Sequence, residues 1–250
     1  IGGGEEIFAS ADGHLEVNAG TTLDMTAPTV DINASTAVTI DGPDVTISSS
    51  TSTKPVLTIQ NNTNDANPAT IKLVKDRGAA GASDDKIGDI AFFGEDDGEN
   101  STEFARIRAH NAEAGDGSEG GELKLQVATH NGTMKSGLKL KDGNASNEID
   151  VTIGSTTTSL TTVEGTMLVE GGHITVGGST PKITIGDGDA EDTMLAFNGN
   201  AQDYRIGLDD GNDTLEIGHG TTHGTNTAIE IDNSGQVTKF NIPAADVAQA

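Results

Sequence analysis

Two groups of neighbouring carboxylates, Asp84-Asp85 and Glu95-Asp-Asp97 with Glu99, come nearest to catalytic chemistry in this sequence. A carboxylate pair hydrolyses a glycosidic bond when one member acts as the general acid and the other as the nucleophile or base. Both groups fall in polar segments, without apolar neighbours to raise one pKa. No glycine-rich phosphate loop or Ser/His/Asp order points to another reaction. The sequence therefore predicts no catalytic residue and no enzyme.

Aspartates in glycine-rich turns raise the question of calcium, which needs several converging oxygen ligands. The segment Gly211-Asn-Asp-Thr-Leu215 resembles part of a calcium-binding nonapeptide repeat, but that motif works as a tandem array and is not repeated here. We interpret these residues as solvated turn residues. They are Asp187, Asp189, Asp192, Asp209, Asp210 and Asp213.

His219 and His223 are four residues apart, a spacing that places both on one face of a strand. A symmetric trimer would then bring copies of one histidine together as a metal ring. The intervening Gly-Thr-Thr indicates a loop, however, and no carboxylate stands nearby to orient the rings. We predict no metal site and no cofactor.

A regular series of short strands is the main structural signal of the chain. Five apolar-polar-apolar units start at residues 15, 23, 30, 38 and 45 and are separated by turn residues such as Asp41-Gly-Pro43. A solenoid needs roughly 20 residues per coil and about three coils to bury its own core. Residues 15–47 are too short for that, so we expect two further copies of the chain to cover the apolar side chains.

The predicted trimer core consists of the apolar residues of these five units. They are Leu15, Val17, Leu23, Met25, Val30, Ile32, Val38, Ile40, Val45 and Ile47. The fold class that follows is all-β: an elongated homotrimeric fibre with intertwined triple-stranded β-helix stalk segments and small β-sandwich-like modules.

Composition agrees with many short strands and argues against a conventional globular core. Only 33% of the 250 residues are apolar, aromatic residues are 3%, and Trp and Cys are absent. The net charge of −25 excludes nucleic-acid binding, which depends on Lys and Arg. No segment approaches the roughly 18 apolar residues of a membrane span, so we predict no membrane insertion. The chain starts with Ile, and we expect it to be a processed product or a segment of a longer polypeptide.

The pattern changes along the chain and predicts four parts. Residues 1–53 form the first stalk, residues 54–145 a β-sheet knob module, residues 146–190 a second β stalk, and residues 191–250 a second small β module with a connector. Six alternating strands are expected in the knob and suggest a small antiparallel sheet or a sandwich; they are 56–59, 70–74, 87–93, 105–109, 123–127 and 138–140. The residues expected inside the knob are Leu57, Ile59, Ile90, Phe92, Ile107, Leu123 and Leu125. A short helix at 103–114 is the alternative to one of these strands.

Strands of the same alternating kind are expected in the rest of the chain. They are 151–153, 174–176 and 183–185 in the second stalk, and 194–197, 204–206, 215–217 and 229–231 in the second module. Asn198-Gly199 is a hairpin signal.

Segments of the knob resemble tail-fibre and related virion structural proteins of tailed bacteriophages, especially marine cyanophages. The resemblance covers roughly residues 54–145, and a second similar segment runs from Ala201 to Asp232. The segments that carry the first resemblance are Pro55-Val-Leu-Thr-Ile-Gln-Asn61, Ile87-Gly-Asp-Ile-Ala-Phe92, Ala105-Arg-Ile-Arg-Ala109, Gly120-Gly-Glu-Leu-Lys-Leu125 and Leu138-Lys-Leu-Lys-Asp-Gly143. The opening repeats are similar in architecture to the intertwined trimeric β-helix of phage spikes.

The resemblance implies a structural segment of a phage tail fibre that forms a rigid trimeric rod for host attachment. Its partners would be two identical chains and other virion tail proteins, with the receptor contacted outside this segment. It would be located in the virion after assembly in the bacterial cytoplasm. The alternatives are a bacterial surface adhesin stalk rigidified by calcium, and a polysaccharide-degrading tailspike.

A glycan site within this segment is not expected, because sugars stack on aromatic faces and the chain has few. Tyr204 is the one candidate platform, and its place in an alternating strand favours a packing role.

Overall fold

The computed structural model describes residues 6–9, 15–170 and 172–241, and their regular structure is almost entirely β. The predicted all-β class is confirmed. The helical structure in these residues is one 3-10 turn of three residues, so no described helix is long and apolar enough to cross a membrane. Contacts divide the chain into unit 1, residues 1–159, and unit 2, residues 160–250.

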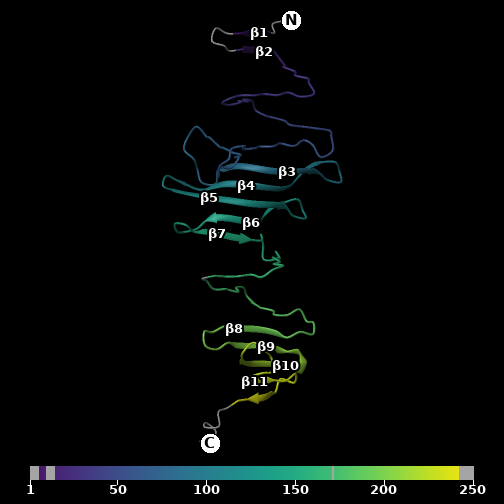
Figure 1. Cartoon of the computed structure of the whole chain (residues 1–250), viewed down its shortest axis with the longest axis vertical. Helices are drawn as coiled ribbons and strands as arrows, with labels where there is room; N and C mark the ends of the chain where they lie inside the picture. The colour runs from purple at the N-terminus through teal and green to yellow at the C-terminus, as the bar shows by residue number, and fades with distance from the viewer. Residues whose placement is uncertain (1–5, 10–14, 171, 242–250) are drawn as a thin grey trace. The chain divides into compact units, whose positions relative to one another are not determined.

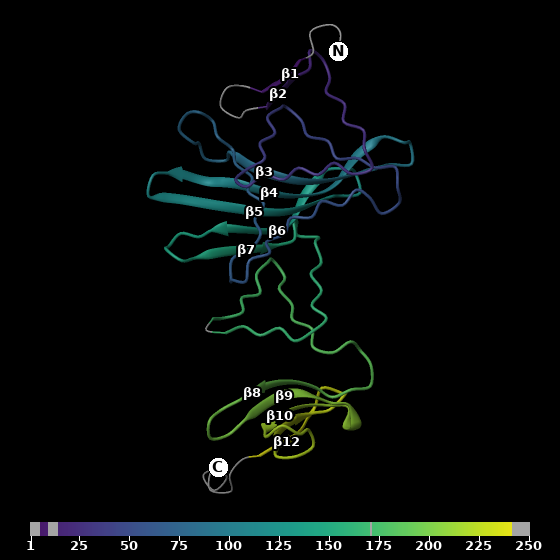
Figure 2. The same ribbon diagram turned by 45° about the horizontal axis from the view of Figure 1, so that its top comes forward.

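Unit 1 begins with a two-stranded antiparallel hairpin of β1 (Glu6–Ala9) and β2 (Leu15–Asn18). Strand β2 contains the first of the five predicted units, Leu15-Glu-Val17. The next four units lie in extended backbone without strand pairing, which Figure 2 draws as a plain trace after β2. The same is true of 56–59 and 70–74, which were expected to be strands.

The missing pairing has a simple cause, because a strand requires a hydrogen-bonded neighbour. Across residues 19–83, a single backbone-to-backbone hydrogen bond joins described residues, from the Lys54 N–H to the Thr51 carbonyl at 3.1 Å. These residues therefore have the sequence pattern of strands but no partner strand among the described residues of the same chain.

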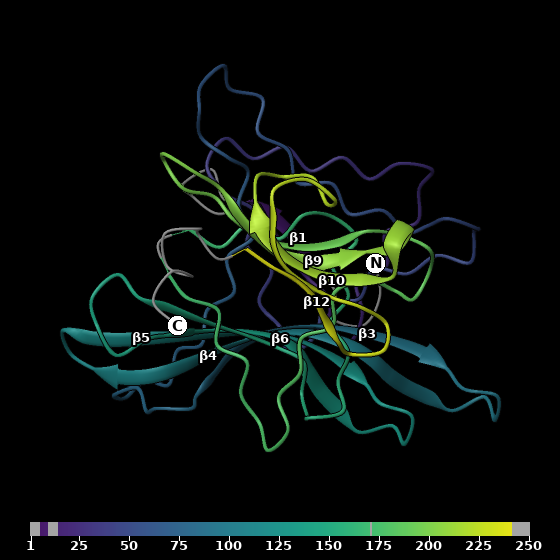
Figure 3. The same cartoon turned by 90° about the horizontal axis from the view of Figure 1, so that it is seen from below.

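The knob of unit 1 is a five-stranded antiparallel meander in the order β3-β4-β5-β6-β7 (Figure 1). Its strands are β3 (Lys86–Glu95), β4 (Ser101–Gly115), β5 (Ser118–Ala128), β6 (Met134–Asp142) and β7 (Ile149–Ile153). Viewed along the ladder, the strands superpose as one twisted layer (Figure 3). The module is thus a single antiparallel sheet, the first of the two forms expected for it, and not a sandwich.

Two details of this sheet differ from sequence expectations. The alternative helix at 103–114 is wrong, because these residues lie in β4 and pair with both β3 and β5. The strand at 151–153, expected in the second stalk, belongs to β7 and pairs with β6 through Leu138 and Ile153.

Unit 2 contains a second five-stranded antiparallel meander in the order β8-β9-β10-β11-β12. Its strands are β8 (Thr193–Phe197), β9 (Tyr204–Asp209), β10 (Thr214–His219), β11 (Thr227–Ile231) and β12 (Val237–Phe240). The four strands predicted here are confirmed, and Asn198-Gly199 lies in the β8–β9 connection. Residues 174–176 and 183–185, also expected to be strands, have no strand pairing among the described residues.

Candidate functional site

The ten residues predicted to form the trimer core all lie on the surface of the single chain. Their exposed fractions range from 44% for Val17 to 71% for Ile40. The chain therefore does not bring them together into a core of its own.

The rest of the described chain shares this property, because none of its apolar residues is buried. The solvent-accessible surface is 20845 Å². A compact monomer of 25.5 kDa would expose roughly 10,400 Å². Large apolar side chains exposed in this number mark interaction surfaces rather than a finished surface.

The sheet of unit 2 has an inverted polarity. In β9 the polar or small residues Arg205, Gly207 and Asp209 are buried, whereas the alternating Tyr204, Ile206 and Leu208 are exposed. Strand β10 repeats this pattern, with Thr214 and Glu216 buried and the apolar residues between them exposed. The chain thus covers the polar face of this sheet itself and leaves the apolar face open.

The sheet of unit 1 also separates polar from apolar residues. On its polar face, Arg108 binds Asp89 through two hydrogen bonds of 2.7 and 2.5 Å, and Lys124 lies 2.7 Å from Glu122. Seven residues were expected inside the knob. Leu57 and Ile59 lie in the segment before the sheet and are exposed. Of the five in the sheet, Ile107 is half-buried and the other four are exposed. The expected interior is therefore absent from the described part of a single chain.

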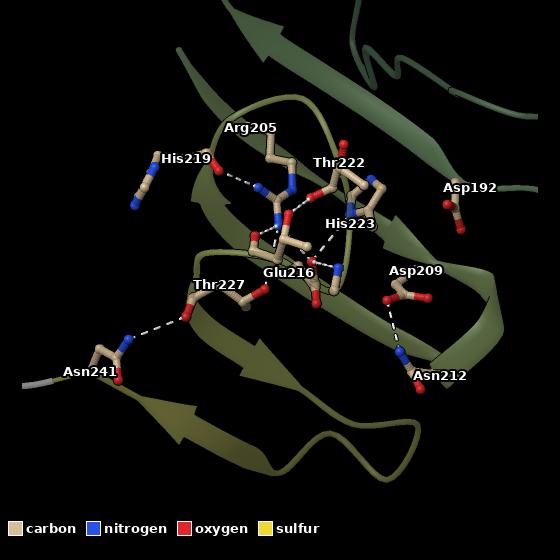
Figure 4. A network of polar contacts seen from close by, with 12 residues as sticks. Asp192, Arg205, Asp209, Asn212, Glu216, His219, Thr222, His223, Thr227 and Asn241 are labelled. Atoms are coloured by element: carbon tan, nitrogen blue, oxygen red, sulfur yellow. Dashed lines mark hydrogen bonds and ion pairs between the residues drawn. The ribbon is translucent and has the colours of Figure 1, made fainter. Parts of the chain in front are cut away.

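A cluster of buried polar side chains lies on the polar face of the unit 2 sheet (Figure 4). Arg205 is fully buried and lies 2.9 Å from Glu216 Oε2 through its Nη2 atom. The same guanidinium donates to the carbonyls of His219 and Thr225 at 2.7 and 2.8 Å. Its charge is thus balanced by one carboxylate and two backbone oxygens.

Glu216 is the centre of this cluster. Its Oε2 atom accepts from the Gly224 N–H at 3.0 Å and lies 3.3 Å from Nδ1 of His223. Burial alone would raise the pKa of Glu216, but the hydrogen bonds, above all that from Arg205, outweigh it and lower the pKa from 4.5 to about 2. The carboxylate is therefore held ionised in the interior.

The cluster fixes the segment that joins β10 to β11 onto the sheet. Two glycines make the close approach possible: a Cβ atom on Gly207 would lie 2.9 Å from the His223 ring, and one on Gly218 would lie 2.7 Å from the Asn226 carbonyl. Arg205, Glu216 and His223 are each at least nine-tenths buried. The arrangement is closed to a substrate and works as a structural clamp.

The two histidines considered as a metal ring have different positions. His219 ends β10 and is exposed, and its ring points away from the cluster in Figure 4. His223 lies in the following connection, where its Nε2 atom is 3.2 Å from the Thr193 carbonyl. The structure does not bring the two rings together.

Five of the six turn aspartates line one cavity of about 620 Å³ in unit 2; the sixth, Asp192, instead accepts the Asp210 N–H at 2.9 Å. Asp209 is bonded to Asn212 at 2.8 Å. In the part of the chain that the structure describes, no three His, Cys, Asp or Glu residues are grouped closely enough to hold a metal ion.

Two of the carboxylates considered for glycoside hydrolysis, Asp96 and Asp85, stabilise turns. Asp96 Oδ1 accepts the N–H groups of Gly98 and Asn100, both at 2.9 Å, in the connection between β3 and β4. Asp85 binds Arg77 at 2.8 Å and accepts the Ala82 N–H at 2.9 Å. Backbone hydrogen bonds are the main cause of the lowered pKa of both residues, the opposite of the raised pKa that a general acid needs.

Tyr204 lies at an end of the open apolar face, paired with Phe197 on β8 and His219 on β10. Its ring is exposed in the single chain, so the packing role expected for it is not fulfilled within that chain.

Comparison with known proteins adds no relative: no family model, curated protein or solved structure matches the chain.

Proposed function

We propose that the chain is a structural, non-enzymatic segment of a phage tail fibre, in which three copies wind into a rigid rod for host attachment. The exposed apolar side chains and the unpaired backbone support association with other chains. The resemblance of residues 54–145 and 201–232 to tail-fibre proteins supports a fibre as the assembly.

The observation that carries the proposal is the unpaired backbone of residues 19–83. These residues repeat the apolar-polar-apolar pattern of strands, yet one backbone hydrogen bond joins described residues among them. Parallel copies of the same segment would supply both missing elements, the hydrogen-bond partners and the cover for the apolar side chains. Intertwined copies would provide the hydrogen-bond partners and the apolar cover at the same time.

The function that follows is mechanical. Interchain strand pairing makes a stiff spacer, and several fibres on one particle convert weak receptor contacts into firm attachment by avidity. The net charge of −25 on each chain keeps such rods apart in solution. The receptor would be contacted by residues outside this segment or by another virion protein.

Light scattering on the purified chain tests the assembly. We expect a mass of three times 25.5 kDa, about 76 kDa. A stable folded monomer would contradict the intertwined trimer.

Immunogold labelling with antibodies against the chain tests the location. We expect decoration of fibres on intact phage particles. Decoration of a bacterial cell surface, with none on particles, would replace the fibre by the adhesin stalk. Release of reducing sugars from host polysaccharide by the purified chain would instead favour a tailspike enzyme.

A further inference from the structure

The open apolar faces of the two sheets are built from rows of residues in cross-strand register. In unit 2 one row crosses all five strands, because each member is paired with the next. Its members are Leu195, Ile206, Ile217, Ile229 and Phe240. In unit 1 the corresponding row also crosses all five strands. Its members are Ile90, Ile107, Leu125, Leu138 and Ile153.

The opposite face of each sheet is unsuited to apolar packing. In unit 2 it is occupied by the clamp around Arg205 and Glu216. In unit 1 it carries charged residues in adjacent strands, with Arg108 paired to Lys124 and Lys124 to Lys139 in register. The apolar rows are therefore the faces that association must cover.

The length of the strands favours three copies around an axis over two copies face to face. Packed sheets lie about 10 Å apart, so each lies about 5 Å from the middle of the core. Three sheets at that distance from an axis enclose a triangle with sides of about 17 Å, the length of about five residues at about 3.4 Å each. A two-sheet sandwich sets no such limit on strand length.

The strands of unit 2 meet this limit, and so do the apolar stretches of two strands in unit 1. Those of unit 2 have five, six, six, five and four residues. Those of unit 1 are mostly longer, but the large apolar residues of β5 extend only from Leu123 to Val127, and those of β7 from Ile149 to Ile153. In these two strands the large apolar residues span five residues, and β5 begins before them with the polar and glycine residues Ser118–Glu122.

We infer that each five-stranded sheet is one side of a three-sided β-prism, whose other two sides are the same sheet from two further copies of the chain. The strands run across the axis, and the apolar rows run along it. This inference rests on the trimer of the proposed function, but it places the contact on the two sheets, whereas that proposal rests on residues 19–83. The partner at these surfaces is the chain itself.

Adjacent residues on opposite faces of one strand provide matched probes, because the chain contains no cysteine. In β7, Ile153 belongs to the apolar row and Thr152 to the polar face, and both are exposed in the single chain. In β12, Phe240 and Lys239 form the same kind of pair. The four variants are I153C, T152C, F240C and K239C in the full chain.

The measurement is the rate of maleimide modification of each thiol in the native protein, together with its mass by light scattering. With a trimeric mass, we expect I153C and F240C to react at least about tenfold more slowly than T152C and K239C, because packed groups react only through rare opening. Denaturation in urea should make the four rates equal.

The alternative outcomes separate the two proposals. Equal rates for all four thiols at a trimeric mass would overturn the prism and leave the trimeric rod intact. A dimeric mass with protected I153C and F240C would replace the prism by a two-sheet sandwich. A monomeric mass for the unmodified chain would overturn both proposals.

Discussion

Residues 19–83 and the β8–β12 sheet need partners to different degrees. The sheet pairs its own strands and buries its own polar cluster, so it lacks only a cover for its apolar face. Residues 19–83 lack that cover and also the hydrogen-bond partners of their backbone. Loss of assembly should therefore unfold the stalk completely but leave the sheet paired.

The two sheets also differ from each other on their polar faces. The Arg205–Glu216 pair is buried, with exposed side-chain fractions of 0% and 1%. Asp89 and its partner Arg108 remain partly exposed, at 33% and 14%. A buried charge that loses its partner stays without solvation, whereas an exposed one regains water. Equivalent substitutions should therefore have unequal costs.

The largest effect is expected from Ile32→Asp in the stalk. Three copies of Ile32 at the axis would become three unpaired buried carboxylates, at a cost of at least about 3 kcal/mol per chain. Light scattering and thermal melting should show loss of the trimer. Asp31→Ala, on the opposite face of the same unit, is the control and should retain it. An Ile32→Asp trimer with unchanged melting temperature would show that residues 15–47 do not form an axial core.

Glu216→Ala should have the next largest effect. It leaves the Arg205 guanidinium buried without its carboxylate, which costs about 3–5 kcal/mol. Urea unfolding of the full chain measures the loss of stability, with Glu191→Ala in an exposed turn as the control. The double variant Arg205→Met/Glu216→Leu should be more stable than Glu216→Ala, because it removes the uncompensated charge. A Glu216→Ala protein as stable as the control would contradict the clamp.

Acid should weaken the clamp in a defined pH range. The pKa of Glu216 is lowered from 4.5 to about 2 on folding, so its contribution is complete above pH 4.5 and is lost as the pH falls towards 2. The shift corresponds to about 3 kcal/mol. The stability difference between the native protein and Glu216→Gln should shrink across this range. A difference independent of pH between 2 and 5 would rule out the lowered pKa.

Asp89→Ala should have the smallest effect. Its hydrogen bonds with Arg108 are well formed, but both groups are partly exposed, so the loss should be about 0.2–1 kcal/mol and should shrink at high salt. Urea unfolding at two salt concentrations measures it. A loss as large as that of Glu216→Ala would remove the difference drawn between the two polar faces.

The sequence predicted strands well where the chain supplies its own neighbours. Period-2 alternation located β4, β5, β9 and β10 within their observed bounds, because their partners follow within a few residues along the chain. The same alternation at 30–32 and 38–40 predicts strands, but the single chain forms none there. A pattern reports which face is apolar but not which chain supplies the partner.

The clamp was not predicted, although its residues leave a signal. Arg205, Gly207 and Asp209 alternate with apolar residues, and Glu216 and Gly218 do the same one strand later. Period-2 alternation predicts a strand with one buried apolar face and places its polar residues in water. Which face the connection 220–226 covers depends on contacts between residues far apart in the sequence, such as Arg205 with Thr225.

Hydrogen exchange of the backbone amides in residues 19–83 tests the central claim most directly. Within the described chain, these amides donate one hydrogen bond to a backbone carbonyl, from Lys54 to Thr51. Five others donate to side-chain oxygens, those of Thr51, Thr63, Asn67, Gly78 and Ala82. None of these donors lies between Val30 and Ile47, so protection there must come from other copies. We predict slow exchange at these residues in the native protein. Exchange at the rate of an unfolded peptide throughout 19–83, while β9 and β10 remain protected, would contradict the intertwined stalk.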